Sequence, residues 1–364
     1  MNWRTRLEPF MLQLWQGRSW LACALLPLAW LYGSVLSVRR ALYAIGLKQQ
    51  TRLHVPVIVV GNIFVGGTGK TPFVIWLVEQ LRAQGWHPGV IARGYGAHLD
   101  QVTEVQPESD AQLVGDEPVL IQQRTTAPVV VGRSRVRAAQ QLLRLHPAVD
   151  VLISDDGLQH YALARTIEIQ LCDERGHGNG WLLPAGPLRE PASRRADFFV
   201  LNAAAAANTA QPSTESRPSK AVTAAAKTES SQNARAYRMT LQPEFAYSLS
   251  QPAQRRSVSS LPKDQRIVAA AGIGNPQRFF AMLRGHGIRL SDAIALPDHF
   301  DYAHNPFEAI RADMILITEK DAVKCARIHH LANDARLWAV PVTASIAEPL
   351  LDHILEMLRG QSTP

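Results

Sequence analysis

A glycine-rich segment that ends in lysine and threonine gives the clearest indication of chemistry in this sequence. Residues 61–72 read GNIFVGGTGKTP and directly follow an apolar run. In such a loop, backbone N–H groups turn onto phosphate oxygens, and the start of the next helix adds positive potential. Lys70 can reach the β- and γ-phosphates of a nucleotide, and the Thr71 hydroxyl can bind Mg²⁺. The segment therefore predicts a nucleotide cradle made of Gly66, Gly67, Thr68, Gly69, Lys70 and Thr71.

The loop departs from the strict spacing of phosphate-binding loops at one position. Phe64 stands where the pattern GxxxxGK[ST] has its first glycine. An ordinary glycine-rich turn between a strand and a helix is the competing interpretation. The lysine and threonine at the expected places, between an expected strand and an expected helix, favour phosphate binding.

A second pattern ends in paired carboxylates. Residues 149–156 read VDVLISDD, an apolar strand-like run that ends in Asp155 and Asp156. Phosphoryl-transfer enzymes with such loops hold Mg²⁺ between the loop hydroxyl and an acid at a strand end. Thr71, Asp155 and Asp156 therefore form the expected metal site, and the sequence leaves open which aspartate contacts the ion.

The elements that must position these motifs alternate between apolar strands and amphipathic helices. This alternation is typical of a parallel sheet covered by helices. In the first part of the chain we expect strands at 55–60, near Val90, and at 128–131, 149–154 and 167–171, with helices at 72–84 and 135–145. Later we expect strands at 267–271, near Ile294 and at 314–318, with helices at 276–285 and 349–358. The predicted fold class is α/β, a P-loop NTPase-like parallel sheet flanked by helices, with a second, smaller α/β lobe and an N-terminal membrane-attachment helix.

Composition divides the chain into five ranges. These are an N-terminal membrane-attachment segment (1–54), a P-loop lobe (55–202), a low-complexity insertion (203–236), an inter-lobe linker (237–265) and a C-terminal α/β lobe (266–364). The insertion is rich in Ala, Ser, Thr, Gln and Pro, with almost no large apolar residues, so we expect it to be disordered. A short alanine-rich helix at 203–207 is the competing interpretation.

The overall composition excludes several classes of protein. With 364 residues, 46% hydrophobic and 19% charged, the chain is neither globally disordered nor a many-pass membrane protein, and two lobes are expected. Its three cysteines (Cys23, Cys172 and Cys325) lie far apart, so neither a disulfide framework nor a cysteine zinc site is expected. A reducing, cytosolic setting fits best.

The formal net charge of +7 is concentrated near the N-terminus. Residues 1–56 contain seven lysines and arginines against Glu8 alone, and the rest of the chain is almost neutral. No nucleic-acid partner is therefore expected. The cations flank the uncharged run Trp20–Val38, which indicates attachment to a membrane surface. Spanning and interfacial docking both remain open because Pro27 and Gly33 interrupt the run, and a buried apolar helix is the alternative.

The remaining sequence narrows the class of nucleotide-binding protein. A guanine-specific protein would carry an Asn/Thr-Lys-x-Asp strand end, and in the nearest candidate, residues 318–321 (TEKD), the lysine comes one place late. The LSGGQ-type signature of a transport ATPase does not occur in the sequence. Phosphoryl transfer from ATP to a bound acceptor, with ATP and Mg²⁺ as cofactors, is the function that remains. A membrane-tethered nucleotide switch acting on a protein partner is the alternative, and a soluble ATP-dependent ligase is a third hypothesis.

Several further motifs occur together in a fixed order. They are ARGYG at 92–96, GDEP at 115–118, DDGLQH at 155–160, PAGPLREP at 184–191 and PDHFDY at 297–302. With the glycine-rich loop, these motifs resemble the tetraacyldisaccharide 4′-kinase family over most of residues 10–355. The insertion at 203–236 departs from the family pattern.

The resemblance implies an activity and a place in the cell. It implies transfer of the γ-phosphate of MgATP to the 4′-hydroxyl of a tetraacylated glucosamine disaccharide 1-phosphate in lipid A biosynthesis. The implied location is the cytoplasmic face of the bacterial inner membrane. The expected partners are the lipid-linked disaccharide and the membrane surface, and no obligatory protein partner is expected.

The resemblance also implies catalytic residues. Asp116 of GDEP is the expected general base, and His299 of PDHF is its expected partner across the interface of the lobes. From the residues alone, Asp116 would be interpreted as a helix N-cap and His299 as an exposed loop histidine. Lys70 completes the expected catalytic set. The residues expected to contact substrate or to support the catalytic groups are Glu117, His160 and Arg189.

Guanidinium groups suit the phosphate oxygens of ATP or of the acceptor. Arg189 is the preferred candidate. A second group, Arg133, Arg135 and Arg137, could serve in the same way, and a solvated helix face is the competing interpretation. Lys320 and Lys324 are expected either near the nucleotide or on the surface.

Overall fold

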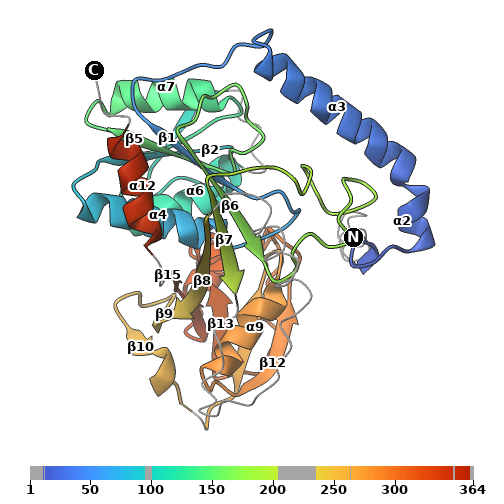
Figure 1. Cartoon of the computed structure of the whole chain (residues 1–364). Coiled ribbons are helices and arrows are strands. Elements are labelled where there is room, and N and C mark those ends of the chain that lie inside the picture. The colour runs from blue at the N-terminus through green and yellow to red at the C-terminus, as the bar shows by residue number, and fades with distance from the viewer. Residues whose placement is uncertain are drawn as a thin grey trace.

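A large sheet with a parallel centre forms the core of the first lobe (Figure 1). The computed structural model describes residues 11, 13–94, 101–203, 235–262, 264–346 and 349–360, so the interior of the insertion predicted at 203–236 lies outside the described residues. The nine strands stand in the order β15 (Val342–Ile346), β8 (Arg235–Pro243), β7 (Phe198–Ala203), β6 (Ile167–Asp173), β1 (Val57–Gly61), β5 (Val151–Asp155), β2 (Pro88–Ala92), β4 (Val129–Val131) and β3 (Thr103–Val105). Only β15 and β3, at the two edges, pair antiparallel.

The central strands are uniformly apolar because both faces of the sheet are covered. Every residue of β1, β5 and β2 is buried, as a parallel sheet between two helical layers requires. One face packs against α4 (Lys70–Ala83), α6 (Asp116–Thr125) and α12 (Leu350–Arg359). The other face packs against α7 (Arg135–Leu145) and the loops that follow β5. Short helix α5 (Ala111–Val114) precedes α6.

The second lobe is a smaller α/β unit. Its six strands stand in the order β10 (Arg255–Ser257), β9 (Phe245–Ser248), β14 (Leu337–Val340), β13 (Met314–Thr318), β11 (Ile267–Ala271) and β12 (Leu290–Ala295). The helical elements of this part are η1 (Val258–Ser260), α9 (Pro276–Gly285), α10 (Glu319–Cys325) and α11 (His329–Ala332). Phe279, Phe280 and Leu283 of α9 pack against β11 and β13. The two sheets and their helices confirm the predicted α/β fold class.

The sheet pairings divide the chain differently from the predicted ranges. The predicted linker 237–265 contains most of β8, which pairs with β7 in the first sheet, and β9 and β10, which belong to the second. After β14 the chain returns to the first lobe, where β15 pairs with β8 and α12 joins the core. The last part of the predicted lobe 266–364 therefore lies in the first lobe, and the chain crosses between the lobes twice.

The uncharged N-terminal run forms two consecutive helices at the side of the first lobe. They are α2 (Trp20–Ala24) and α3 (Leu26–Ala44), and Pro27 lies in the first turn of α3, where its missing N–H costs nothing (Figure 1). Pro27 thus begins a helix instead of interrupting one. Within the described part of the chain, no helix combines the length and hydropathy needed to cross a membrane.

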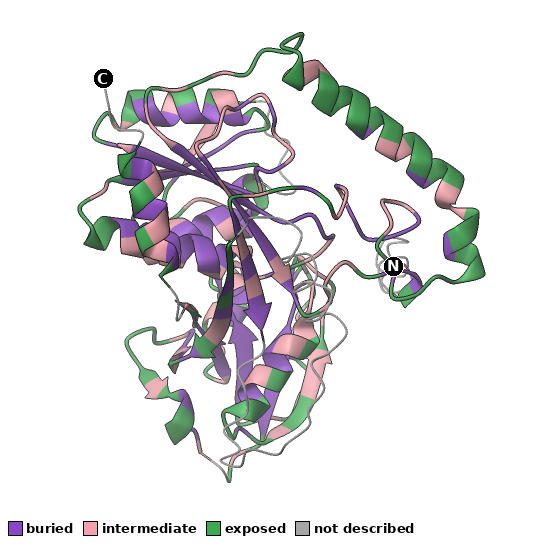
Figure 2. Ribbon diagram, viewed as in Figure 1, coloured by how far each residue is buried: buried purple, intermediate pink, exposed green. Residues whose placement is uncertain are grey.

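Most of α3 is exposed, as Figure 2 shows. Leu28, Leu31, Val35 and Val38 are exposed at spacings of three and four residues, with Leu31 63% accessible, whereas Ala29 and Leu36 are buried. These spacings place the four exposed side chains on one face of the helix. The alternative of a buried apolar helix is therefore wrong.

Candidate active site

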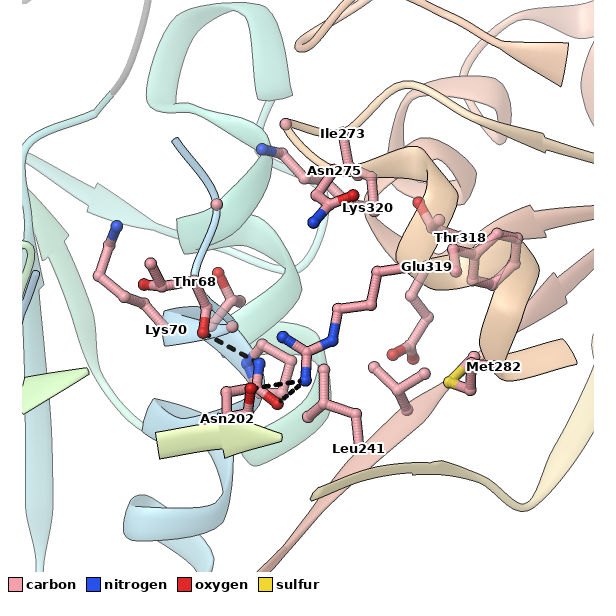
Figure 3. A pocket seen from close by; sticks show the side chains of 18 of the residues that line it. Thr68, Lys70, Asn202, Leu241, Ile273, Asn275, Met282, Thr318, Glu319 and Lys320 are labelled. Atoms are coloured by element: carbon pink, nitrogen blue, oxygen red, sulfur yellow. Dashed lines mark hydrogen bonds between the residues drawn. The ribbon is translucent and has the colours of Figure 1, made fainter. Parts of the chain in front are cut away.

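A cavity of about 1100 Å³ lies between the two lobes. The first lobe contributes the glycine-rich loop from Gly66 to Thr71, together with Glu117, Asp156 and Arg189. The second lobe contributes the loop around Gly274 and the side chains of Asp298, His299 and Lys320. Figure 3 shows Lys70 and Thr68 on one side of this space and Lys320 on the other. Most of the residues singled out from the sequence therefore line this cavity, whereas Asp116, Asp155 and His160 are not among its lining residues.

The glycine-rich loop connects the end of β1 to the start of α4. Gly66 and Gly69 have φ of 107° and 87°, a conformation that residues with a Cβ rarely adopt. Lys70 and Thr71 are the first two residues of α4, so the N–H groups of its first turn face the loop. The Lys70 Nζ lies 3.6 Å from Asp156 Oδ1 and 3.5 Å from Asn62 Oδ1. This is the strand, loop and helix arrangement that binds phosphate.

The two aspartates stand beside the loop because β5 is the neighbour of β1. Val60 of β1 is in register with Asp155, the last residue of β5. Asp156 accepts hydrogen bonds from both terminal nitrogens of Arg189, each at 3.0 Å. Burial opposes ionisation of Asp156, but the charges of Lys70 and Arg189 outweigh it and hold the pKa of this carboxyl well below its usual range. Asp156 is therefore an anion with cations already beside it.

Asp155 has a different environment from its neighbour. Burial, with the nearby Glu117 carboxylate second, raises its pKa above the usual range, and its Oδ1 has no hydrogen-bond partner. A buried carboxylate oxygen without a donor suits a bound cation. No group of three or more His, Cys, Asp or Glu side chains that could hold a metal occurs among the described residues. Two carboxylates and the Thr71 hydroxyl nevertheless fit Mg²⁺, which takes few protein ligands and completes its shell with water and phosphate oxygens.

Arg135 proves to be structural. Its side chain is buried and donates to the carbonyl oxygens of Gly132 and Asp155, each at 3.1 Å, so it supports the end of β5. Arg133 and Arg137 are exposed. The interpretation that these three arginines lie on a solvated helix face therefore fails for Arg135 and holds for Arg133 and Arg137.

The Asp116 side chain meets His299 across the lobe interface. Asp116 is the first residue of α6, and Gly115, with φ of 96°, occupies the N-cap position, so the N-cap interpretation of Asp116 is wrong. His299 follows β12 in a loop and adopts a left-handed backbone with φ of 55°. The His299 Nδ1 lies 3.2 Å from Asp116 Oδ2. The exposed-loop interpretation of His299 also fails, since only 26% of its side chain is accessible.

Two lysines of α10 complete the surroundings of Asp116. Lys324 Nζ lies 3.4 Å from Asp116 Oδ2, and Lys320 Nζ lies 4.0 Å from the same atom and 3.1 Å from Glu117 Oε1. Lys320 and Lys324 are four residues apart, so they project from one face of the helix. Burial would raise the pKa of Asp116, but the hydrogen bond with His299 and the two ammonium charges hold it well below the usual range.

His160 lies in the loop after β5. Burial first, and then the charges of Arg135, Arg93 and Arg39, lower its pKa to about 4. His160 is therefore neutral at physiological pH in an electropositive region. Arg39, on α3, also donates to the Gln159 carbonyl at 3.2 Å, and the Tyr32 hydroxyl donates to the Arg189 carbonyl at 2.8 Å. These bonds connect the exposed N-terminal helix to the site.

Several residues of the site were not singled out from the sequence. They are Asn62, which contacts Lys70 and Arg189; Asp298, 3.7 Å from Lys320; and Asn202 and Arg278, which lie beside the loop. Asn62 and Asp298 belong to the motifs GNxxxGGTGKTP and PDHF, so the sequence could have identified them as residues of the site. Asn202 and Arg278 stand outside every motif, and only the tertiary structure brings them to the loop.

The chain is similar to known proteins over nearly its whole length. The family model described as tetraacyldisaccharide-1-P 4′-kinase matches residues 21–359. A tetraacyldisaccharide 4′-kinase of Janthinobacterium sp. (strain Marseille) is 52% identical over 364 residues, covering 99% of this chain and 98% of the relative. One of Bordetella parapertussis is 47% identical over 352 residues, 96% of each chain. The crystal structure of "apo" form LpxK from Aquifex aeolicus in complex with ATP is similar with a TM-score of 0.71 and 26% identity, over 93% of this chain and 99% of that one. This chain belongs to the tetraacyldisaccharide 4′-kinase family.

Proposed function

We propose that this kinase transfers the γ-phosphate of ATP to the 4′-hydroxyl of its acylated disaccharide 1-phosphate inside the cavity between the lobes. The observation that carries the proposal is that the phosphate-type loop with Lys70 and the pair Asp116–His299 belong to the same site, and Lys70 and His299 line one cavity. The similar LpxK structure contains ATP, which supports the nucleotide assignment.

The loop side of the cavity holds the triphosphate. Backbone N–H groups of residues 66–71 bind phosphate oxygens, and Lys70 neutralises charge on the group that is transferred. Thr71, Asp155 and Asp156 would hold Mg²⁺, which would neutralise negative charge on the phosphates when bound. Arg189 keeps Asp156 ionised and in place through its two hydrogen bonds.

The opposite side of the cavity activates the acceptor hydroxyl. Asp116 takes the proton of the hydroxyl, and His299 orients the carboxylate through Nδ1. A carboxylate whose pKa is held low is a weak base, and Lys320 is one cause of that low value. Lys320 lines the cavity, so incoming phosphates compete for its ammonium group. Asp116 becomes more basic when they do, because a nearby cation is drawn away.

The electropositive region around His160 suits the 1-phosphate of the acceptor. The charges of Arg39, Arg93 and Arg135 act together there, next to the loop that bears Asp156. Guanidinium groups bind phosphate oxygens in bidentate geometry. The region thus gives the anionic end of the disaccharide a place close to the reacting groups.

The N-terminal helices hold the enzyme at the membrane that contains its substrate. The exposed apolar face of α3, with Trp20 of α2 and Trp30 of α3, suits insertion into the interface of a bilayer. Arginines at the ends of the run attract anionic lipid headgroups. The location we propose is the cytoplasmic face of the inner membrane, where the enzyme docks without spanning the bilayer.

Transfer of labelled γ-phosphate from ATP to a tetraacylated disaccharide 1-phosphate in mixed micelles tests the proposed site. Wild type is expected to label the lipid, and Lys70→Ala to lose nearly all transfer. Arg82→Ala, an exposed cation at the other end of α4, serves as the control and is expected to retain transfer. Transfer by Lys70→Ala at the wild-type rate would show that the loop does not hold the transferred phosphate.

A further inference from the structure

Three consecutive carbonyl groups of the phosphate loop are each held by a side chain. Gly66 O accepts from Asn62 Nδ2 at 3.1 Å, Gly67 O from Arg175 Nη2 at 2.7 Å, and Thr68 O from Asn202 Nδ2 at 3.0 Å. A loop that turns its N–H groups onto phosphate must turn carbonyl groups away from it. These three donors fix that orientation, and they come from the ends of β1, β6 and β7.

Asn202 is buried against the loop. It is 1% exposed and packs so tightly on Gly69 that a Cβ at that glycine would overlap the Asn202 amide. Its Nδ2 donates to the Thr68 carbonyl, as the dashed line in Figure 3 shows. The position of Asn202 therefore sets the position of the peptide between Thr68 and Gly69, immediately before Lys70.

The second lobe reaches this asparagine through Arg278 of α9. Arg278 Nη2 donates to the Asn202 backbone carbonyl at 2.9 Å and also to its side-chain Oδ1. The Asn202 amide thus accepts from the second lobe with its oxygen and donates to the loop with its nitrogen. Only one orientation of the amide lets its oxygen accept from Arg278 and its nitrogen donate to Thr68.

The same lobe touches the loop backbone at a second point. A Cβ on Gly274, in the turn before α9, would lie 2.9 Å from Gly67 N, closer than real Cβ atoms approach. The turn and the Arg278 side chain therefore both contact the loop side of the cavity. Movement of α9 away from the first lobe would break both contacts together.

We propose that Asn202 and Arg278 are positioning residues that couple the seating of the second lobe to the shape of the phosphate loop. With α9 seated, Arg278 fixes the Asn202 amide, and the amide fixes the Thr68 carbonyl and the N–H groups that follow. With α9 displaced, the loop loses this restraint and binds phosphates more weakly. The proposal rests on the assignment of residues 66–71 to the nucleotide phosphates.

Hydrogen exchange without nucleotide tests this coupling directly. In the full-length protein, Arg278→Met is expected to increase deuterium uptake in peptides that cover residues 62–70, although Arg278 lies in the other lobe. Arg284→Met, which removes an exposed arginine of the same helix, is the control and is expected to leave uptake unchanged. Unchanged exchange of the loop in Arg278→Met would overturn the proposal, and it would leave the kinase assignment intact because no substrate is present.

Arg278 also lines the cavity, so it could bind phosphate directly. A double-mutant cycle tests whether Arg278 instead acts through Asn202. The probe is the dissociation constant of a non-hydrolysable ATP analogue. Asn202→Ala and Arg278→Met are each expected to weaken binding about tenfold, a loss of about 1.4 kcal/mol, and the double variant to be no weaker than the weaker single variant. If the double variant instead bound the analogue about a hundredfold more weakly, the two residues would act independently, and coupling of Arg278 to the loop through Asn202 would be excluded. If the buried Asn202→Ala change prevents folding, the exchange measurement on Arg278→Met still decides.

Discussion

At the scale of single residues, the centre of the site is one carboxylate surrounded by cationic groups. Asp116 is 4% exposed and lies within 4.0 Å of His299, Lys320 and Lys324. A buried carboxylate is stable only with such partners. The partners also keep Asp116 ionised at neutral pH, which is the state that the proposed general base requires.

Asp116→Asn keeps the shape of this side chain and removes its ability to accept a proton. Turnover is expected to decrease about a thousandfold, within the range of general base catalysis, while the affinity for ATP stays nearly constant. Steady-state kinetics and nucleotide titration measure the two quantities. Asp150→Asn, at a surface ion pair with His87, is the control. Near-normal turnover of Asp116→Asn would show that Asp116 is not the general base.

His160 makes stability depend on pH in a defined window. Its pKa is about 4 in the folded protein against 6.5 as the ordinary value. Between these values the unfolded chain binds a proton that the folded chain does not, so stability decreases as pH falls from 6.5 towards 4. His160→Gln is expected to reduce this decrease in denaturant unfolding measured at several pH values. An unchanged slope would show that His160 is not buried as described.

The sequence predicted the position of residues that a local pattern places. Lys70 and Asp155 lie where they were expected because a strand, a loop and a helix place them by themselves, before any tertiary contact is known. Arg135 was interpreted less well, since its burial depends on the packing of α7 against the end of β5. Arg278 could not be found, because its partner Asn202 lies 76 positions away and in the other lobe.

At the scale of elements, the sequence predicted most of the central strands, but it missed β7, the fully buried β14 and helix α6. The central strands are continuous apolar runs, and α7 spans the predicted residues 135–145. Strand β8 was missed because its exposed and buried residues are mixed, and because 237–243 resembles a polar linker. The return of β15 and α12 to the first sheet depends on pairing with β8, which no local pattern reveals.

The exposed face of α3 leads to a prediction about membrane binding. Leu31→Glu with Val35→Glu places two charges on this face and is expected to weaken binding to anionic vesicles more than tenfold. Each of the two apolar side chains would contribute about 1.5–3 kcal/mol when the bilayer buries it. Ser37→Glu adds a charge to an exposed polar position of the same helix and is the control. Co-sedimentation measures the bound fraction. Equal binding by the double variant and wild type would exclude this face as the docking surface.

At the scale of the whole molecule, ion pairs between α6 and α10 join the two lobes. Arg124 pairs with Glu319 at 2.7 Å, Glu117 with Lys320, and Asp116 with Lys324. The carboxylate that we propose as the general base is thus part of the interface that holds the lobes together. The same charges would then serve both catalysis and the docking of the lobes.

Lys324→Met tests this shared role. Lys324 is 10% exposed and also lies 3.7 Å from Asp321, so its loss leaves two buried carboxylates with less compensation. The free energy of unfolding is expected to decrease by about 3 kcal/mol, with a lower turnover. Urea unfolding and kinetics measure the two effects. Lys48→Met, at an exposed position, is the control; equal stability of Lys324→Met and wild type would contradict the account of the interface.

Movement of a phosphate from the nucleotide at the loop to the sugar in the same cavity can be followed in a single reaction. ADP and the lipid phosphorylated at the 4′-oxygen would be quantified in one reaction of the wild-type enzyme with ATP and the acylated disaccharide 1-phosphate. One phosphorylated lipid is expected for each ADP, with both products lost in Lys70→Ala. Formation of ADP without phosphorylated lipid would exclude transfer to the sugar and would favour a nucleotide switch acting on a protein partner.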